Sequence, residues 1–279
     1  MDLRELINKK SISDSSKKVY YSLLKRMEKA NFKPPTKANQ KIAFVKEHLS
    51  TFDNPNTKLD MLNLIVVIRN ELELPIDKLK EFRTELKQHQ KSKQVSKMQN
   101  TGENLLSLET FKEKLQKTFD EKQYKKYIVN YLMMKYGVRN KDLNLSIIKT
   151  KKEVEPKNNY LLIKKDGIKY IRDDYKTHSK YGTQTHTITD PDFIQAVKKQ
   201  GVGQLLQGTQ ISNDLRKLYI DKHGEAKIFK MVIDYFYDNK DAEAIKKIAD
   251  SRGTSMGVVD GFYNVNATSN PIEEAKALA

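Results

Sequence analysis

Hydrophobic side chains recur at helical spacing through the first hundred residues. The stretch 14–30 has apolar or aromatic side chains three or four positions apart, and the polar cluster 13–16 offers N-caps for it. Breaks rich in proline and asparagine lie at 34–36 and 54–57. We therefore predict a compact unit with a basic exterior, built from four helices over residues 14–30, 41–49, 58–72 and 75–93.

A polar and basic stretch follows at 91–103, and it contains Gly102. Such a composition is typical of a linker that can lie along a phosphate backbone. We place the linker at 94–106, between a first domain over 1–93 and a second over 107–279. The second domain opens with helices predicted over 107–119 and 121–136, the latter ended by Gly137 as a C′ glycine.

The hydrophobic period changes near residue 159. Two short apolar runs, 160–163 and 168–171, flank a Lys-Lys-Asp-Gly turn and predict a β-hairpin, and 185–189 predicts a third strand. Helical spacing then returns over 192–200, 212–223, 227–237, 242–249 and 256–265. We expect a mainly α protein: a helical N-terminal domain, then a mostly helical domain with a small antiparallel three-stranded sheet.

The charge balance narrows the range of partners. The net charge is +16, and residues 1–100 hold 21 Lys and Arg against 12 Asp and Glu, so the excess extends along the chain. Such an excess favours a polyanion, most often nucleic acid. Cysteine is absent, which excludes thiolate chemistry. No apolar run approaches the roughly 18–20 residues of a membrane span, and the charged N-terminus is unlike a secretory signal. We expect an intracellular protein, cytoplasmic or nuclear, with no membrane partner.

Four short segments carry residues suited to phosphate chemistry. The first is 136–143, where Gly137 ends a helix, Arg139 follows, and Asp142 comes three residues later. The second is 174–182, a turn of the sheet that contains Lys176 and Lys180. Each has an ordinary structural explanation: a capped helix with an Arg–Asp pair, and solvated lysines on a turn.

The third segment, 212–219, begins a predicted helix with Asn213 near its start and Arg216 in its first turn. The helix dipole disfavours a cation there unless an anion lies nearby. The fourth segment, 252–264, contains Thr254 and, nine residues later, Tyr263. A tyrosine in a terminal helix is most often a core or rim aromatic, so the order of all four segments matters more than any one of them.

Taken together in this order, the four segments resemble the tyrosine recombinase family, which shares its catalytic fold with type IB topoisomerases. That family has an arginine in a G-hydrophobic-R-x-x-E/D-L junction, a hairpin lysine, H-x-x-R, then G-H/W and a later tyrosine. The resemblance covers residues 100 to 265, and the helices before it look like the core-binding domain of the family. It implies site-specific cleavage and rejoining of double-stranded DNA, as in recombination or integration by a mobile element or virus.

The resemblance also implies a role for each residue. Arg139 and Arg216 would bind the non-bridging phosphate oxygens, Lys176 would protonate the leaving 5′ oxygen, and Tyr263 would form a 3′-phosphotyrosyl link. Guanidinium groups match the charge of the five-coordinate phosphorus, so neither a metal nor another cofactor is required. The family further implies a tetramer on DNA, formed by exchange of the C-terminal tail.

Two positions depart from the family pattern. Asn213 stands where the family has the histidine of H-x-x-R, and Thr254 stands at the later His or Trp. Asn213 can still donate a hydrogen bond to phosphate, whereas Thr254 cannot act as an imidazole base. The proton of Tyr263 is left without an obvious acceptor. His178 and His186 lie on the predicted sheet, but the sequence does not place them at the site, and Lys180 is a rival to Lys176 as general acid.

The sequence leaves three other functions open. The departures at Asn213 and Thr254 favour, as an alternative, a catalytically impaired DNA-binding protein with the recombinase fold. A metal-dependent nuclease is suggested by Pro191-Asp192 and Glu225-Ala226-Lys227, but that chemistry needs Glu225 and Lys227 on a strand, and the spacing here is helical. A basic helical adaptor would make the order of the segments a coincidence.

Overall fold

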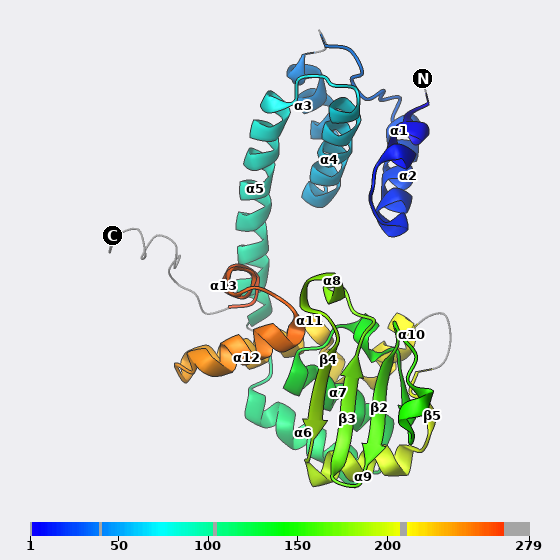
Figure 1. Cartoon of the computed structure of the whole chain (residues 1–279). Helices are drawn as coiled ribbons and strands as arrows, with labels where there is room; N and C mark the ends of the chain where they lie inside the picture. Colours follow the sequence, from blue (N-terminus) through cyan, green and yellow to red (C-terminus); the bar gives the residue numbers. More distant parts are fainter. Residues whose placement is uncertain (1, 39–40, 103–104, 207–210, 265–279) are drawn as a thin grey trace. The chain divides into compact units, whose positions relative to one another are not determined.

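The structure of the chain is a computed structural model that describes residues 2–38, 41–102, 105–206 and 211–264. It divides into two compact units, Met1–Ser96 and Lys97–Ala279 (Figure 1). In the part of the chain that is described, no helix is both long enough and apolar enough to pass through a membrane.

The first unit is helical, and all four helices predicted for it are present. It consists of α1 (Leu3–Lys9), α2 (Asp14–Lys29), α3 (Ile42–Ser50), α4 (Pro55–Glu71) and α5 (Asp77–Gly102). The short α1 was not among the predicted helices. The prediction for α5 was too short, because the helix continues to Gly102 through residues expected to form the linker. Their polar composition indicated a linker, but Lys and Gln are also good helix formers.

The core of the first unit forms around α4. Most of the apolar side chains of this helix are fully buried, among them Met61, Leu62 and Ile65, against residues of α1, α2 and α3. Arg69 near its end is also buried, and its guanidinium donates to the carbonyl oxygens of Pro35, Lys37 and Pro75. One cation thus secures the proline-rich connection before α3 and the loop before α5.

The second unit contains most of the predicted helices close to their expected bounds. These are α6 (Leu108–Asp120), α7 (Tyr124–Tyr136), α9 (Pro191–Gln200), α10 (Ile211–Leu218), α11 (Glu225–Asp238), α12 (Ala242–Arg252) and α13 (Met256–Phe262). Short helical turns lie at α8 (His178–Tyr181), η1 (Asn140–Leu143), η2 (Lys151–Glu153) and η3 (Ile220–Lys222).

The sheet differs from the prediction: it is five-stranded and mixed, not three-stranded and antiparallel. The predicted strands are present as β2 (Asn159–Lys164), β3 (Gly167–Arg172) and β4 (Gln184–Ile188), paired antiparallel. Two more strands, β1 (Leu145–Ile148) and β5 (Gly203–Gln204), extend it to the order β4-β3-β2-β1-β5, with β1 parallel to β2. Runs of four and two residues are too short to show a period of two, which explains why the sequence did not reveal them.

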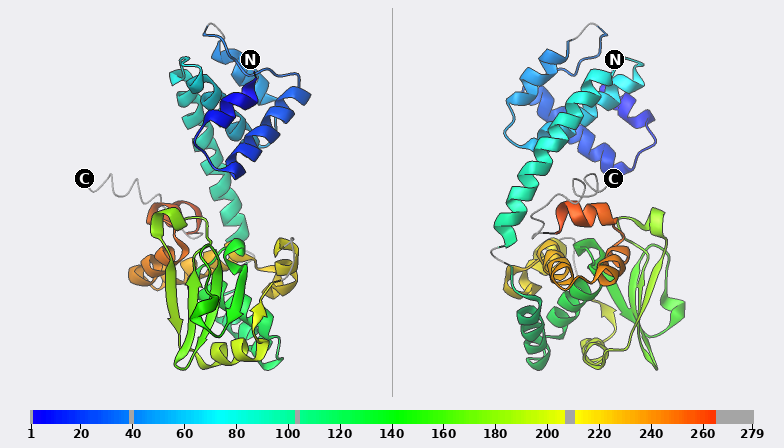
Figure 2. Two further views of the ribbon diagram at one scale, coloured as in Figure 1. Left: turned by 45° about the vertical axis from the view of Figure 1, so that its right-hand side comes forward. Right: turned by 90° about the vertical axis from the view of Figure 1, so that its left-hand side faces the viewer.

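Helices cover one face of this sheet, as Figure 2 shows in its right-hand view. α7 lies at the centre of this layer and contacts α6, α9, α11 and α12. Alternate strand residues such as Leu161, Ile168 and Tyr170 face these helices and are fully buried. A small cluster on the opposite face contains Ile148, Tyr160 and Leu162. The sheet therefore holds the turn between β3 and β4 in a fixed position relative to α7 and α12.

Candidate active site

Arg139 follows the end of α7, and α7 ends at a position, 137, that only glycine allows. Gly137 caps the helix with φ +58°, and a Cβ on it would lie 2.8 Å from the ring of Phe229. This confirms the predicted C′ glycine. Arg139 is half-buried, and its Nη1 donates to the backbone oxygen of Arg252 at 2.7 Å. Burial lowers the pKa of Arg139, and the charge of Arg252 lowers it further. The first segment is thus joined directly to the fourth.

Asp142 lies under Arg139 and is fully buried. One of its oxygens accepts the backbone N–H of Arg139 at 3.1 Å and also pairs with Nη1 of Arg172 on β3 at 3.3 Å. Burial raises the pKa of Asp142, and the charge of Arg172 opposes that rise. The Asp142 side chain therefore positions the backbone that presents Arg139, and it is not open to solvent.

Arg172 is a site residue that the sequence analysis missed. It is fully buried and donates to Gln184 on β4 and to the backbone oxygen of Ser251 on α12, while its guanidinium lies 4.5 Å from the ring centroid of Tyr175. A signal was present, because Arg172 continues the core-facing alternation of Ile168 and Tyr170 along β3. A charge at an inward position is expected to have a buried partner.

Lys176 lies on the turn after β3, between two anchored neighbours. Tyr175 is buried, and its hydroxyl donates to the oxygen of Gly182 at 2.6 Å. The hydroxyl of Thr177 donates to the oxygen of Gly253 at 3.0 Å. The side chain of Lys176 itself is exposed. One hydrogen bond thus closes the turn on itself, and the other holds the backbone beside Lys176 against the loop that leads to α13. α8 and α13 lie at the same end of the sheet (Figures 1 and 2).

Lys180, the rival to Lys176 as general acid, and His178 lie on the same turn. Lys180 is exposed on α8, with its Nζ 5.0 Å from the ring centroid of Tyr181. The Nε2 of His178 is 3.0 Å from Oδ1 of Asp173, which also accepts from the hydroxyl of Thr183. Asp173 is thus engaged with several groups of the turn, and His178 is oriented toward it.

Tyr263 lies at the end of α13 beside a second arginine that the sequence analysis did not assign to the site. Arg252 is 2% exposed, and its Nη2 lies 3.3 Å from the hydroxyl oxygen of Tyr263 and 3.4 Å from Oε1 of Glu225. Its Nη1 donates to the oxygen of Gly137 at 2.5 Å. The ring of Tyr263, half-buried, packs edge-on against Phe229 with centroids 4.7 Å apart. The tyrosine is therefore held by packing and by a buried cation.

Arg216 does not lie in the first turn of its helix, so this prediction was wrong. α10 begins at Ile211 and ends at Leu218, so Arg216 lies in its last turn, where the dipole favours a cation. Arg216 is exposed. α10 packs against η1, and the hydroxyl of Tyr219 donates to Oδ1 of Asn140 at 2.9 Å. Burial raises the pKa of Tyr219, and the Arg216 charge acts against that rise. The third segment is thus connected to the first through Tyr219.

The two departures from the family pattern lie in different environments. Asn213 is exposed on α10. Thr254 is half-buried directly after Gly253, which has φ +64°, and its amide donates to the oxygen of Ala249 at 3.0 Å. Neither residue provides an imidazole near Tyr263.

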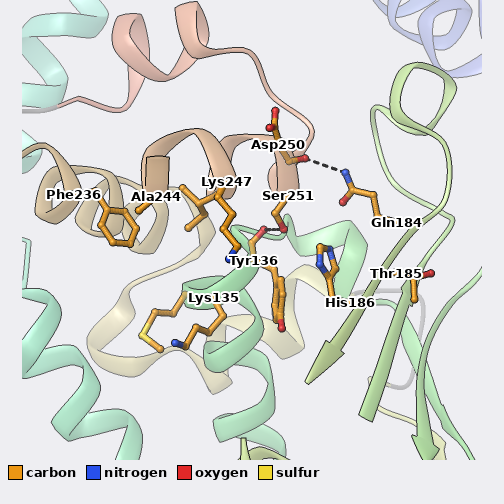
Figure 3. A pocket seen from close by; sticks show the side chains of 12 residues that line it. Lys135, Tyr136, Gln184, Thr185, His186, Phe236, Ala244, Lys247, Asp250 and Ser251 are labelled. Carbon is orange, nitrogen blue, oxygen red and sulfur yellow. Dashed lines mark hydrogen bonds between the residues drawn. The ribbon is translucent and has the colours of Figure 1, made fainter. Parts of the chain in front are cut away.

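His186 lies in a cavity between β4, α7, α11 and α12 (Figure 3). Its ring is 4.6 Å from that of Tyr136, and its Nε2 is buried without a hydrogen-bond partner. Burial lowers the pKa of His186 to about 4, and Arg172 contributes. Ser251 and Gln184 at this cavity join α12 to α7 and to β4, by hydrogen bonds to the oxygens of Tyr136 and Asp250. The end of α12, next to Arg252, thus forms part of the wall of this cavity.

The residues that suggested a metal-dependent nuclease do not form a metal centre. Glu225 and Lys227 lie in α11, not on a strand, and Glu225 is engaged with Arg252 and with the backbone N–H of Asn140. Asp192, in α9, pairs with Gln116. Within the described ranges, no group of three or more His, Asp or Glu is arranged to hold a metal ion.

Segments distant in sequence thus meet through direct contacts. Arg139 contacts the backbone of Arg252, Arg252 contacts the hydroxyl of Tyr263, and the turn with Lys176 is bonded to Gly253. The arrangement places the guanidinium of Arg252 at a phenol, with Arg139 bonded to the backbone of Arg252, and such a combination suits a reaction at an anionic phosphate. No family model, curated protein or solved structure matches the chain.

Proposed function

We propose that the chain is a DNA strand-transfer enzyme of the tyrosine recombinase kind. The proposal rests on two contacts at the end of α12, shortly before α13 and Tyr263. The turn that carries Lys176 is bonded to Gly253, and Arg139 is bonded to the backbone of Arg252. Arg139, Lys176 and Tyr263 are three of the four residues to which the resemblance assigns the chemistry.

In the proposed reaction, the oxygen of Tyr263 attacks the phosphorus of a DNA phosphodiester. The bond to the 5′ oxygen breaks, Lys176 supplies a proton to that oxygen, and a 3′-phosphotyrosyl link remains. Arg139 and Arg216 bind the non-bridging oxygens, where two-point guanidinium contacts stabilise the five-coordinate state. Rejoining is the reverse, with the 5′ hydroxyl of a second strand as the attacking group.

The supporting residues have distinct proposed tasks. Asp142 is a positioning residue, because it holds the amide of Arg139 and pairs with the buried Arg172. Asn213 and Lys180 are exposed and can contact the DNA backbone, and Thr254 can contribute a hydroxyl next to the phosphate. Double-stranded DNA as the partner accords with the net charge of +16. The tetramer formed through the C-terminal tail also stays a proposal, since residues 265–279 lie outside the described residues.

The test is formation of a covalent protein–DNA adduct. The full chain is incubated with a randomised library of end-labelled, nicked duplexes in EDTA, and label retained on the protein after denaturation is measured. We expect an adduct with the wild type, none with Tyr263→Phe, and an unchanged amount with Tyr235→Phe, a half-buried tyrosine of α11. An adduct that persists in Tyr263→Phe refutes the assignment of the nucleophile.

The alternative is a catalytically impaired DNA-binding protein with this fold. It is favoured by the lack of an imidazole at Asn213 and Thr254 and by the position of His186 in a separate cavity. The same experiment separates the two functions, because the impaired protein would shift the labelled duplexes in a native gel and yet form no adduct.

A further inference from the structure

Arg252 lies where a charge on Tyr263 would develop. Its Nη2 is 3.3 Å from the hydroxyl oxygen of Tyr263, and its guanidinium carbon is 5.3 Å from the centroid of the same ring. The arginine is held rigidly, by the oxygen of Gly137 at 2.5 Å and by the ring of Phe229, 4.4 Å from its guanidinium carbon. A buried, fixed donor needs little rearrangement when its acceptor becomes charged.

The charges of the groups linked to Arg139 and Arg252 are not balanced. Arg139, Arg172 and Arg252 are cationic, while Asp142 and Glu225 are the acids that contact them. Asp142 and Arg172 form a mutual pair, and Glu225 is 3.4 Å from Arg252. One cation is left in excess, and the Arg139 and Arg252 charges act unfavourably on each other. A negative charge on Tyr263 would relieve this excess.

We propose that Arg252 is a catalytic residue that stabilises Tyr263 as a phenolate, in place of an imidazole base. This inference rests on the proposed function, in which Tyr263 is the nucleophile. Arg252 keeps its own proton throughout, since a guanidinium does not release it in proteins. Glu225 is the acid that competes with Tyr263 for Nη2 of this guanidinium.

The proton and electron balance of the step is simple. The hydroxyl of Tyr263 releases its proton to solvent, since the side chain is only half-buried. The phenolate oxygen then forms its bond to phosphorus as the bond from phosphorus to the leaving atom breaks. Arg252 donates a hydrogen bond to the phenolate oxygen up to the attack, and the Phe229 contact keeps the ring in place.

A substrate that needs no general acid isolates this step. We use the same nicked duplex library with sulfur in place of the bridging 5′ oxygen, because a thiolate leaves without a proton from Lys176. The rate of adduct formation by the full chain is measured between pH 5.5 and 9.5. A rate that depends on a phenolate rises with pH along one limb, and this limb reports the ease of removing the Tyr263 proton.

Three variants define the expected results. Arg252→Gln removes the charge and should move the limb to higher pH by about one unit, with a loss of about 10- to 100-fold in rate at pH 7. Arg252→Lys keeps the charge and should leave the limb within about 0.3 unit. Phe229→Leu keeps every charge but removes the ring that packs on both Tyr263 and Arg252, so it should lower the rate and move the limb less than Arg252→Gln does.

The outcomes separate the possibilities. If Arg252→Gln is folded by circular dichroism and its limb does not move, Arg252 is structural and the inference is refuted while the proposed function stands. If that variant does not fold, Glu225→Gln decides, since removing the competing acid should move the limb to lower pH, and an unmoved limb refutes the inference. A wild type that forms no adduct refutes the proposed function and this inference together.

Discussion

The hydroxyl of Thr177 donates a hydrogen bond to the carbonyl oxygen of Gly253 at 3.0 Å. The two residues are far apart in sequence, one beside Lys176 on the turn after β3 and the other directly after α12. Gly253 has φ +64°, and a Cβ built on it would lie 2.3 Å from the oxygen of Thr177. The close approach of turn and loop therefore depends on a glycine.

Replacing Gly253 by alanine should destabilise the protein and disturb the turn. The left-handed backbone costs an alanine about 1 kcal/mol, and the contact with Thr177 adds to this, so we expect a loss of about 2 kcal/mol in the free energy of unfolding. Urea unfolding measures it. Gly257→Ala, in α13 with nothing near its Cβ, is the control and should be neutral or slightly stabilising.

A double mutant tests the origin of the Gly253 effect. Thr177→Ala removes the oxygen that the new Cβ would approach, so Gly253→Ala should cost less in that background. An equal cost in both backgrounds would mean that backbone strain alone accounts for the loss.

For the buried pair of Asp142 and Arg172, losing one partner should cost far more stability than replacing both. Asp142→Asn leaves a guanidinium uncompensated in the core, and we expect a loss of about 3–5 kcal/mol in the free energy of unfolding. Replacing both residues, with Asp142→Leu and Arg172→Met, should recover a large part of that loss. Chemical denaturation of the variants provides the comparison, and a double variant no more stable than Asp142→Asn would contradict this account.

His186 should make the stability of the protein fall in mild acid. Its pKa is lowered to about 4, chiefly by burial, whereas an unfolded histidine titrates near 6.5. The unfolded state therefore takes up the proton first, so this contribution is present above pH 6.5 and is lost as the pH falls toward 4. It amounts to no more than about 3 kcal/mol.

The measurement for His186 is the free energy of unfolding at several pH values between 7 and 4, in the wild type and in His186→Gln. The difference between the two proteins should change across this window, because other titrating groups are common to both. A difference that is constant with pH would show that His186 is protonated as easily in the folded state as in the unfolded state.

Much of the helical framework could be predicted because its signals are local. Ser13, in the polar cluster expected to supply the N-cap, caps α2, and Gly137 ends α7 in the left-handed conformation as predicted. The strands β1 and β5 have no such signal. β1 is defined by its pairing with β2, and a pairing partner distant in sequence cannot be identified from a run of four residues.

The candidate site could be predicted only in part, for a related reason. Tyr263 and Arg139 stand in segments with a recognisable order, whereas the importance of Arg252 depends on which atoms it meets after folding. Its position next to Gly253 indicates a helix end, and a basic residue there usually stabilises the dipole. Only the tertiary contacts with Gly137 and Tyr263 reveal a buried cation at the phenol.

Arg216→Ala should separate chemistry from stability. Arg216 is exposed in the last turn of α10, where its favourable interaction with the helix dipole is worth less than about 1 kcal/mol. We therefore expect a change of at most about 1 kcal/mol in the free energy of unfolding but loss of adduct formation on nicked DNA.

The matched control is Lys217→Ala, which removes the adjacent exposed cation. Both variants should weaken DNA binding and its salt dependence, since each can remove a phosphate contact. Only Lys217→Ala should keep the adduct. Equal loss of the adduct in both would mean that Arg216 contributes general charge rather than a specific contact with the scissile phosphate.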